Sequence, residues 1–126
     1  MKALFTLAFS FCLFSTSIFA QDLKLQAESE SRQMAAEFKL NEGEYLKIKK
    51  LNEARLEKIM ALSELREQDE RYLNLRLDQI EEEYAANMFG TLNKKQFRKF
   101  MEYRQEQPYT YAGLTMKYRS VAQSEE

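Results

Sequence analysis

The chain has 126 residues, with 19 basic and 20 acidic side chains, a formal net charge of −1, one cysteine and no histidine. This length suits one small domain, and the balanced charge gives no overall basic field to attract nucleic acid. With no histidine, and no cysteine beyond Cys12 of the N-terminal apolar run, there is no imidazole base, no zinc site of the usual ligand types and no Glu-x-x-His pair for a di-iron site. No Gly-rich phosphate loop appears either. We therefore expect no enzymatic activity, no cofactor, no metal site and no nucleic-acid partner.

The N-terminus has the pattern of a secretory signal. A positive start at Met1-Lys2 precedes an apolar run from Ala3 to Phe14, which is short for a bilayer span. Ala20 suits the position before signal-peptidase cleavage. We predict a signal peptide over residues 1–20, with an uncleaved N-terminal anchor as the alternative, and Cys12 lies within the segment that is removed.

The mature chain reads as all-α. Removing 20 of the 126 residues leaves 106, which support only a modest core, so helix packing must stabilise the protein and a homodimer would help. Helix-breaking residues are few, namely Gly43, Gly90, Gly113 and Pro108, and apolar and polar residues do not alternate as in strands. We expect an elongated helical hairpin or bundle of about four helices.

The predicted helices follow the three- and four-residue spacing of apolar side chains. A first helix is expected over residues 25–38, and a second starts after Asn41. The polar run from Arg66 to Arg71 favours a hairpin or sharp bend near Arg66 to Asp69. The alternative is one helix over residues 42–89, which would be roughly 70 Å long and would leave its apolar stripe poorly covered.

The remaining boundaries come from glycine and proline. Gly90 is expected to end a helix in the left-handed conformation, and Pro108 to stop the helix that begins after Asn93. The inner face of that last helix is expected to carry Phe97, Phe100, Met101 and Arg104. We place a helical domain over residues 21–107 and a C-terminal tail over residues 108–126. In that tail Leu114, Tyr118 and Val121 can form a short helical turn against the bundle, with a frayed tail as the alternative.

One helix-start pattern occurs twice, 52 residues apart. In each copy an Asn stands at the N-cap, and a Glu or Gln three residues later can bond back to the N–H of that Asn, which makes a capping box. A leucine before the cap and an aromatic residue at the fourth helical position can pack together as a hydrophobic staple. The two copies are Leu40, Asn41, Glu44 and Tyr45, and then Leu92, Asn93, Gln96 and Phe97.

With Asn in place of Thr, both copies resemble the L-T-x-x-Q motif of the periplasmic family typified by the chaperone Spy and the envelope-stress regulator CpxP. The resemblance spans residues 40–104, and the first copy departs from the motif further, with Glu44 in place of Gln. It implies a periplasmic location and a thin, curved helical dimer that binds unfolded proteins without ATP. It also implies, for CpxP-like members, docking on the periplasmic domain of a sensor kinase.

The helix after Asn93 is the candidate client-binding element. It combines basic residues with soft apolar side chains, which adapt to varied apolar segments while the cations attract acidic ones. The candidate binding residues are Lys94, Lys95, Arg98, Lys99, Met101 and Arg104. The plainer interpretation is that the cations form a solvated face and the apolar residues belong to the core.

From these patterns we expect an exported, ATP-independent periplasmic chaperone or envelope-stress adaptor. Its partners would be unfolded clients or a sensor-kinase periplasmic domain, and no membrane span would remain after cleavage. The alternatives are a dedicated sensor-kinase regulator without chaperone activity and a structural coiled-coil protein. A metal-resistance role, known for some members of the family, would need ligands that this chain mostly lacks.

Overall fold

The computed structural model describes the backbone of residues 14–65 and 69–124, and the side chains of residues 22–65 and 69–118. These ranges contain helices and no strand, so the all-α prediction is confirmed. The described ranges contain five α-helices, whereas about four were expected. They are α1 (Phe14–Phe38), α2 (Glu42–Ala61), α3 (Glu70–Thr91), α4 (Lys94–Gln105) and α5 (Tyr111–Ser124), and a 3-10 turn, η1 (Leu62–Leu65), extends α2.

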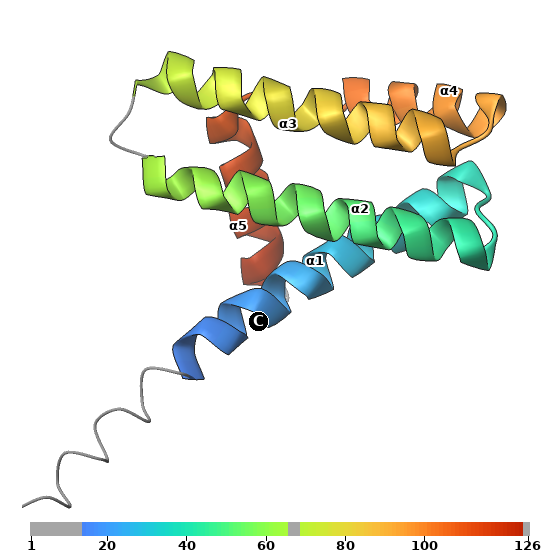
Figure 1. Ribbon diagram of the computed structural model, residues 1–126. Coiled ribbons are helices and arrows are strands. Elements are labelled where there is room, and N and C mark those ends of the chain that lie inside the picture. Colours follow the sequence, from blue (N-terminus) through green and yellow to red (C-terminus); the bar gives the residue numbers. More distant parts are fainter. Residues whose placement is uncertain (1–13, 66–68, 125–126) are drawn as a thin grey trace, which may run out of the picture.

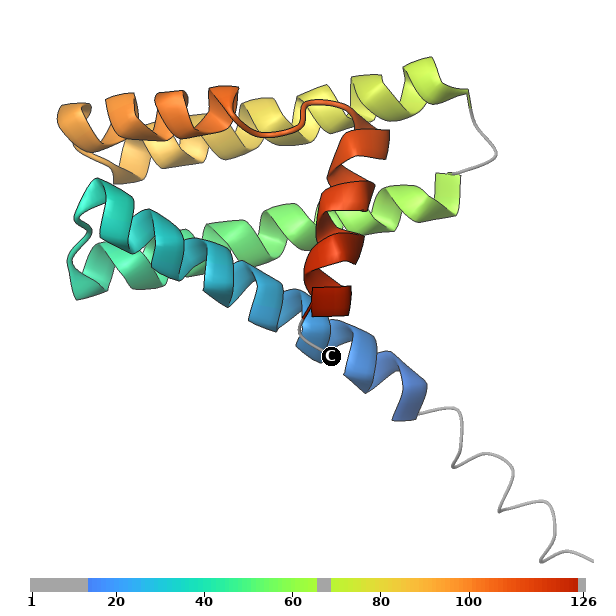
Figure 2. The same ribbon diagram turned by 180° about the vertical axis from the view of Figure 1, so that it is seen from behind.

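The helices form two layers. α2 and α3 run antiparallel as a hairpin, and α1 packs against α2 (Figure 1). α4 turns back along α3, with which it shares ring contacts, and it also contacts α1 (Figure 1). Seen from behind, α5 crosses between the α3–α4 pair and α1 (Figure 2). The predicted hairpin is therefore present, although its connecting residues 66–68 lie outside the described residues. Asp69 caps α3 by accepting a hydrogen bond of 2.7 Å from the backbone N–H of Arg71.

The helix ends differ from one of the predictions. Gly90 does not close a helix in the left-handed conformation: it lies inside α3, and no glycine of the described residues has a positive φ. α3 ends because Leu92 turns into the extended conformation, with φ −92° and ψ 150°, and buries its side chain. Lys39, at φ 54°, is instead the left-handed residue of the described chain.

Two apolar clusters make up the core. The first surrounds the end of the molecule where α1 meets α2 and α3 meets α4, and its buried members are Met34, Phe38, Ile48, Tyr84, Met88, Leu92, Phe100 and Tyr103. The second lies further along the hairpin, and its buried members are Leu56, Ile59, Leu62, Leu73, Leu77, Leu114 and Tyr118.

The inner face of α4 is confirmed at Phe100, while Phe97 and Arg104 are only partly buried and Met101 is exposed. Its buried residues are Gln96, Phe100 and Tyr103, at steps of four and three that keep one helical face toward the core. Phe97 is half-buried at the edge of that face, and Met101 is 39% exposed. Met101 is therefore a surface residue.

The predicted C-terminal tail forms α5, which packs on the bundle through the buried side chains of Leu114 and Tyr118. Thr110 stands at its N-cap, where Oγ1 accepts a hydrogen bond of 3.1 Å from the Gly113 N–H. A Cβ on Gly113 would come within 3.0 Å of Pro108, so glycine permits this close turn. The side chain of Val121, also expected at the bundle, lies outside the described residues.

The predicted cleavage point between Ala20 and Gln21 falls within α1, and residues 1–13 lie outside the described residues. The signal peptide stays a prediction. Among the described residues, no helix combines the length and the apolar character that a membrane crossing needs.

Candidate functional site

Both capping boxes are present in the structure. In the first, Asn41 Oδ1 accepts the Glu44 N–H at 2.8 Å and Glu44 Oε1 accepts the Asn41 N–H at 3.0 Å. In the second, Asn93 Oδ1 accepts the Gln96 N–H at 2.8 Å and Gln96 Oε1 accepts the Asn93 N–H at 3.0 Å. Each box thus satisfies two N–H groups that a helix start would otherwise leave without a partner.

The fold also brings the two boxes together. The Gln96 amide donates a hydrogen bond of 3.3 Å to Glu44 Oε1, which joins residues 52 positions apart. Leu92 belongs to the first core cluster, and Leu40 and Phe97 pack against it, while Tyr45 is partly buried. Because the polar atoms of the boxes bond to one another, the repeated motif ties the starts of α2 and α4 together.

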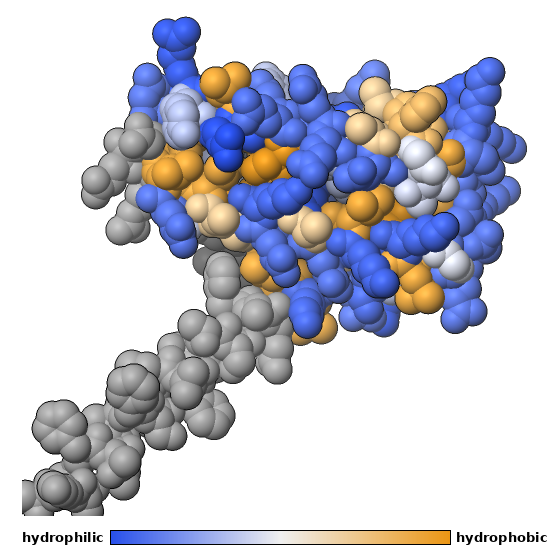
Figure 3. Space-filling view, viewed as in Figure 1, coloured by the Kyte–Doolittle hydropathy of each residue, from blue (hydrophilic) through white to orange (hydrophobic). Residues whose placement is uncertain are grey.

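An exposed patch lies beside this junction, on the last turns of α3 and along α4. Phe89 of α3 is 69% exposed and packs edge to face on Phe97, with ring centroids 5.1 Å apart. Lys94, Arg98 and Met101 lie three or four residues from one another or from Phe97, so they share that side of α4. We call Phe89, Lys94, Phe97, Arg98 and Met101 the aromatic-basic patch. Figure 3 shows apolar side chains gathered over this end of α3.

The other predicted binding residues are not part of this patch. The Lys99 ammonium points toward the end of α1 and donates to the Glu37 carbonyl at 3.4 Å. Arg104 turns inward, with its guanidinium 5.8 Å from the centre of the Phe100 ring and 3.9 Å from a Glu81 oxygen. Lys95 is exposed and lies three residues before Arg98, so it stands at the border of the patch. The six predicted binding residues therefore do not form one surface, because successive residues of a helix point in different directions.

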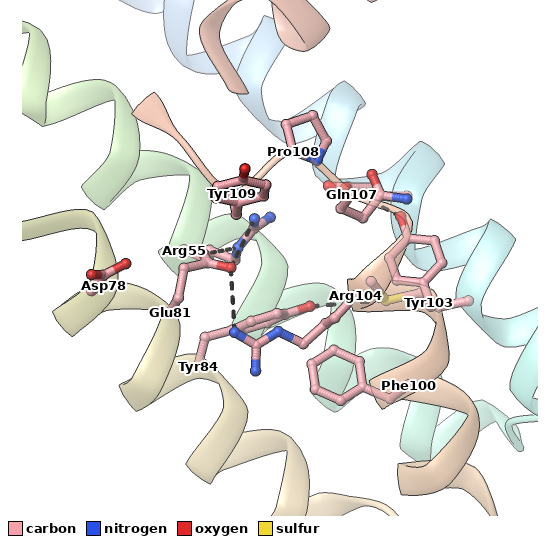
Figure 4. A pocket seen from close by; sticks show the side chains of 12 residues that line it. Arg55, Asp78, Glu81, Tyr84, Phe100, Tyr103, Arg104, Gln107, Pro108 and Tyr109 are labelled. Carbon is pink, nitrogen blue, oxygen red and sulfur yellow. Dashed lines mark hydrogen bonds and ion pairs between the residues drawn. The ribbon is translucent and has the colours of Figure 1, made fainter. Parts of the chain in front are cut away.

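A buried polar cluster, which the sequence patterns did not predict, lies between the two apolar clusters. At its centre Arg55 of α2 is 7% exposed, and its Nε and second amino group donate to the two oxygens of Glu81 at 2.5 and 3.3 Å. The other amino group donates to the Tyr118 hydroxyl of α5 at 3.0 Å. The guanidinium also lies 5.0 Å from the centre of the Tyr84 ring (Figure 4). One arginine therefore connects α2, α3 and α5.

Glu30 of α1 is the second charged centre. This carboxylate is 8% exposed, and it accepts hydrogen bonds from Lys117 at 3.0 Å, the Tyr118 hydroxyl at 3.4 Å and the Tyr103 hydroxyl at 3.5 Å. The Tyr118 hydroxyl thus accepts from Arg55 and donates to Glu30. Such mutual pairing is what allows buried charges to be accommodated.

Neutral polar groups extend the cluster. The Asn52 amide donates to the Ser31 hydroxyl at 2.8 Å, and that hydroxyl donates to the Ala27 carbonyl at 2.6 Å. On its other side, the Asn52 side-chain carbonyl accepts a hydrogen bond from the Tyr84 hydroxyl. A sequence signal for this arrangement did exist. Ile48, Asn52, Arg55 and Ile59 follow one another at steps of four, three and four, which puts two polar residues on the buried stripe of α2.

The charged environment shifts several proton affinities. Burial alone would lower the pKa of Arg55, but the neighbouring Tyr118 and Glu81 outweigh it and raise that pKa above the usual value. Burial raises the pKa of Tyr84, Tyr103 and Tyr118 well above the ordinary phenol value, and Arg55 only partly opposes this. These hydroxyls are therefore neutral donors over the whole physiological range.

A pocket of about 100 Å³ opens beside the cluster, between α3, α4 and the segment that leads to α5 (Figure 4). Arg55 and Arg104 line it together with Glu30 and Glu81, and these side chains pair with one another or with tyrosine hydroxyls. The described residues contain no group of three or more His, Cys, Asp or Glu side chains arranged to hold a metal ion. The paired charges favour a structural role for this cluster.

A second hollow, of about 480 Å³, lies between the end of α2, η1 and the middle of α3. Leu62, Leu65 and Ile80 line it, and the ion pair of Lys58 with Glu83, at 3.1 Å, belongs to its rim. The rim carries both signs of charge, so it gives no preference for a charged partner. The aromatic-basic patch is the more selective of the two surfaces, because Lys94 and Arg98 have one sign.

Comparisons with protein-family models, with curated proteins and with solved structures found no match to this chain.

Proposed function

We propose that the protein is an exported, ATP-independent periplasmic chaperone or envelope-stress adaptor, which binds apolar, acidic segments of unfolded or partner proteins on the aromatic-basic patch. The observation that carries the proposal is Phe89, which is 69% exposed and packs edge to face on Phe97 beside the cations Lys94 and Arg98. Contiguous exposed apolar groups with a charged border are typical of protein-binding surfaces.

The chemistry of the patch suits weak, adaptable binding. Met101 is unbranched and polarisable, so it can adjust to different apolar side chains, and the two phenyl rings give apolar area with little loss of rotamer freedom. Lys94 and Arg98 are exposed, and no ion pair engages either of them among the described residues. They are thus available to carboxylates of a partner, through attraction that salt will screen over about 10 Å at 0.1 M.

The resemblance to the Spy- and CpxP-like family supports the same proposal through the two capping boxes, and it adds the periplasmic location and a homodimer as proposals. The rival functions within this proposal are a dedicated regulator of a sensor kinase and a structural coiled-coil protein. Neither the regulator nor the structural protein needs affinity for unrelated unfolded chains. A chaperone does need it, so this affinity distinguishes the chaperone from both rivals.

An aggregation-suppression assay tests the proposal. The mature protein is added at increasing ratios to two unrelated, chemically denatured test proteins as these are diluted into buffer without ATP. We expect light scattering from both to fall at near-stoichiometric ratios, and to recover as salt is raised. Unchanged scattering from both test proteins would contradict the chaperone function and leave the regulator or the structural protein.

A further inference from the structure

The described attachment of α5 to the rest of the protein combines a small apolar contact with several polar ones. In the described part of α5, Leu114 and Tyr118 are the buried side chains. Tyr111 packs against the same apolar cluster at its edge. The other contacts of the described residues include an ion pair and hydrogen bonds: Lys117 to Glu30 at 3.0 Å, the Tyr111 N–H to Asn74 Oδ1 at 3.1 Å, and the Gln26 amide to the Tyr118 carbonyl at 3.3 Å. An element with few buried apolar contacts is one that opens locally before the protein unfolds.

The surface beneath α5 is, by contrast, apolar at its centre. Leu56, Ile59, Leu73 and Leu77 of the α2–α3 hairpin form one cluster with Leu114 and Tyr118. Glu30 and Arg55 lie at the edge of this surface and contact α5 from two sides. α5 crosses the other helices and is joined to α4 by residues 106–110, which lie at the surface of the bundle (Figure 2).

We propose that α5 is a strap that detaches as a unit, and that the surface beneath it is a docking site for an amphipathic helix of another protein. The occupant is defined by what α5 itself presents there. Leu114 fills the apolar centre, while Lys117 and Tyr118, three and four residues later, reach Glu30 and Arg55. A partner helix would need a leucine-like residue followed at this helical spacing by a cation and an aromatic hydroxyl. This site differs from the aromatic-basic patch and does not depend on it.

Hydrogen exchange on the full chain tests whether the strap opens. We compare Leu114→Ala with Met116→Ala, a matched truncation on the same helix at a side chain that is 73% exposed. Removal of the buried leucine should accelerate exchange of the α5 amides at least about tenfold, while amides in the middle of α2 and α3 keep their wild-type rates. Met116→Ala should leave all rates unchanged. Equal acceleration in every helix would show that α5 is an integral part of the fold and would overturn the strap.

A labelled peptide that copies residues 107–124 tests the docking site. The chain's own α5 competes with the peptide, so weakening α5 should raise the apparent affinity in proportion to the open fraction, at least about tenfold in Leu114→Ala. Met116→Ala should bind the peptide like the wild type. A peptide with its own Leu114→Ala substitution should lose most of this binding. Equal affinity of the wild type and the Leu114→Ala chain for the unmodified peptide would overturn the docking site.

If Leu114→Ala unfolds the whole chain, Tyr118→Phe tests both the opening of α5 and the docking site. It keeps the ring in the apolar cluster and removes the hydroxyl that bridges Arg55 and Glu30. It should therefore accelerate exchange in α5 alone and strengthen peptide binding, and wild-type values of both would overturn the proposal. Substitutions on the aromatic-basic patch should leave peptide binding unchanged, so failure of client capture and failure of the docking site can be told apart.

Discussion

Lys39 ends α1 in a conformation that a side chain adopts at a cost. At φ 54° it is left-handed, and the next N–H, of Leu40, bonds to the Ala35 carbonyl at 3.0 Å. This hydrogen bond spans the six residues of a Schellman motif, whose left-handed position is usually glycine because any Cβ is crowded there. The hydrogen bonding of the Schellman motif therefore compensates for the strain at Lys39.

Lys39→Gly should accordingly stabilise the protein, by about 0.5–1 kcal/mol, since glycine removes the Cβ strain. The matched control is Lys47→Gly, on the exposed side of α2, where glycine should instead cost about 1 kcal/mol of helix stability. Urea unfolding followed by circular dichroism measures both. A loss of stability in Lys39→Gly equal to that in the control would contradict the interpretation of this helix end.

The capping residues should show both their individual contributions and their coupling. Asn41→Ala and Asn93→Ala should each cost about 1 kcal/mol, because each removes an N-cap oxygen. The contact between Gln96 and Glu44 puts the two boxes in one network, so the double mutant should depart from the sum by about 0.5 kcal/mol or more. Asn87→Ala, an exposed position within α3, is the control and should be close to neutral. Wild-type unfolding midpoints for both single mutants would show that the boxes do not stabilise the fold.

At the scale of the helices, the buried polar cluster links the same elements that the two apolar clusters hold together. Glu30 lies on α1, Arg55 on α2, Glu81 on α3, Tyr103 on α4 and Tyr118 on α5. These side chains bond to one another across all five helices. Removal of one charged partner would leave another buried without a counter-charge, which typically costs about 3–5 kcal/mol. The cluster therefore specifies how the helices are arranged relative to one another.

The buried tyrosines predict how stability depends on pH. Their pKa values are raised in the folded state, so above the usual value of about 10 the folded protein holds protons that the unfolded chain has released. Stability is then complete below about pH 10 and falls as the pH rises further. In an alkaline titration, the last phenolate absorbance should appear together with the loss of helical circular dichroism. Ionisation of every tyrosine with the helices intact would contradict the burial of Tyr84, Tyr103 and Tyr118.

The parts of the fold that the sequence predicted are local. Capping boxes depend on residues three positions apart, and the hairpin follows from a polar run between two apolar stripes, so both can be recognised without tertiary information. The contact of Gln96 with Glu44 and the pairing of Arg55 with Glu81 join separate helices, and no local pattern indicates which residues will meet. The predicted end of α3 at Gly90 was wrong for the same reason. The helix ends at Leu92 because the side chain of Leu92 is buried between helices, and no local pattern shows this.

At the scale of the whole molecule, charge is distributed unevenly although its sum is close to zero. α4 carries five cations and one acidic residue, while the chain as a whole has a net charge of −1. Arg104 is engaged with Glu81, and Lys99 contacts the end of α1. Lys94 and Arg98 therefore remain as the cations on the side of α4 that carries Phe97, with Lys95 at its border. We propose that this local basic surface on a nearly neutral protein favours acidic partners without general attraction to anions.

The affinity of the aromatic-basic patch for an unfolded acidic protein tests the central claim most directly. Phe89→Ser and Arg98→Glu change the patch, while Tyr109→Ser, at an 86% exposed aromatic residue, and Lys50→Glu, at an exposed cation of α2, make matched changes elsewhere. The free energy of unfolding of all four variants should lie within about 0.5 kcal/mol of the wild-type value. We predict that the dissociation constant for the unfolded protein rises about tenfold in the two patch variants, as for a residue central to an interface, and stays at the wild-type value in the two controls. Equal affinity in all four variants and the wild type would contradict client binding at this patch.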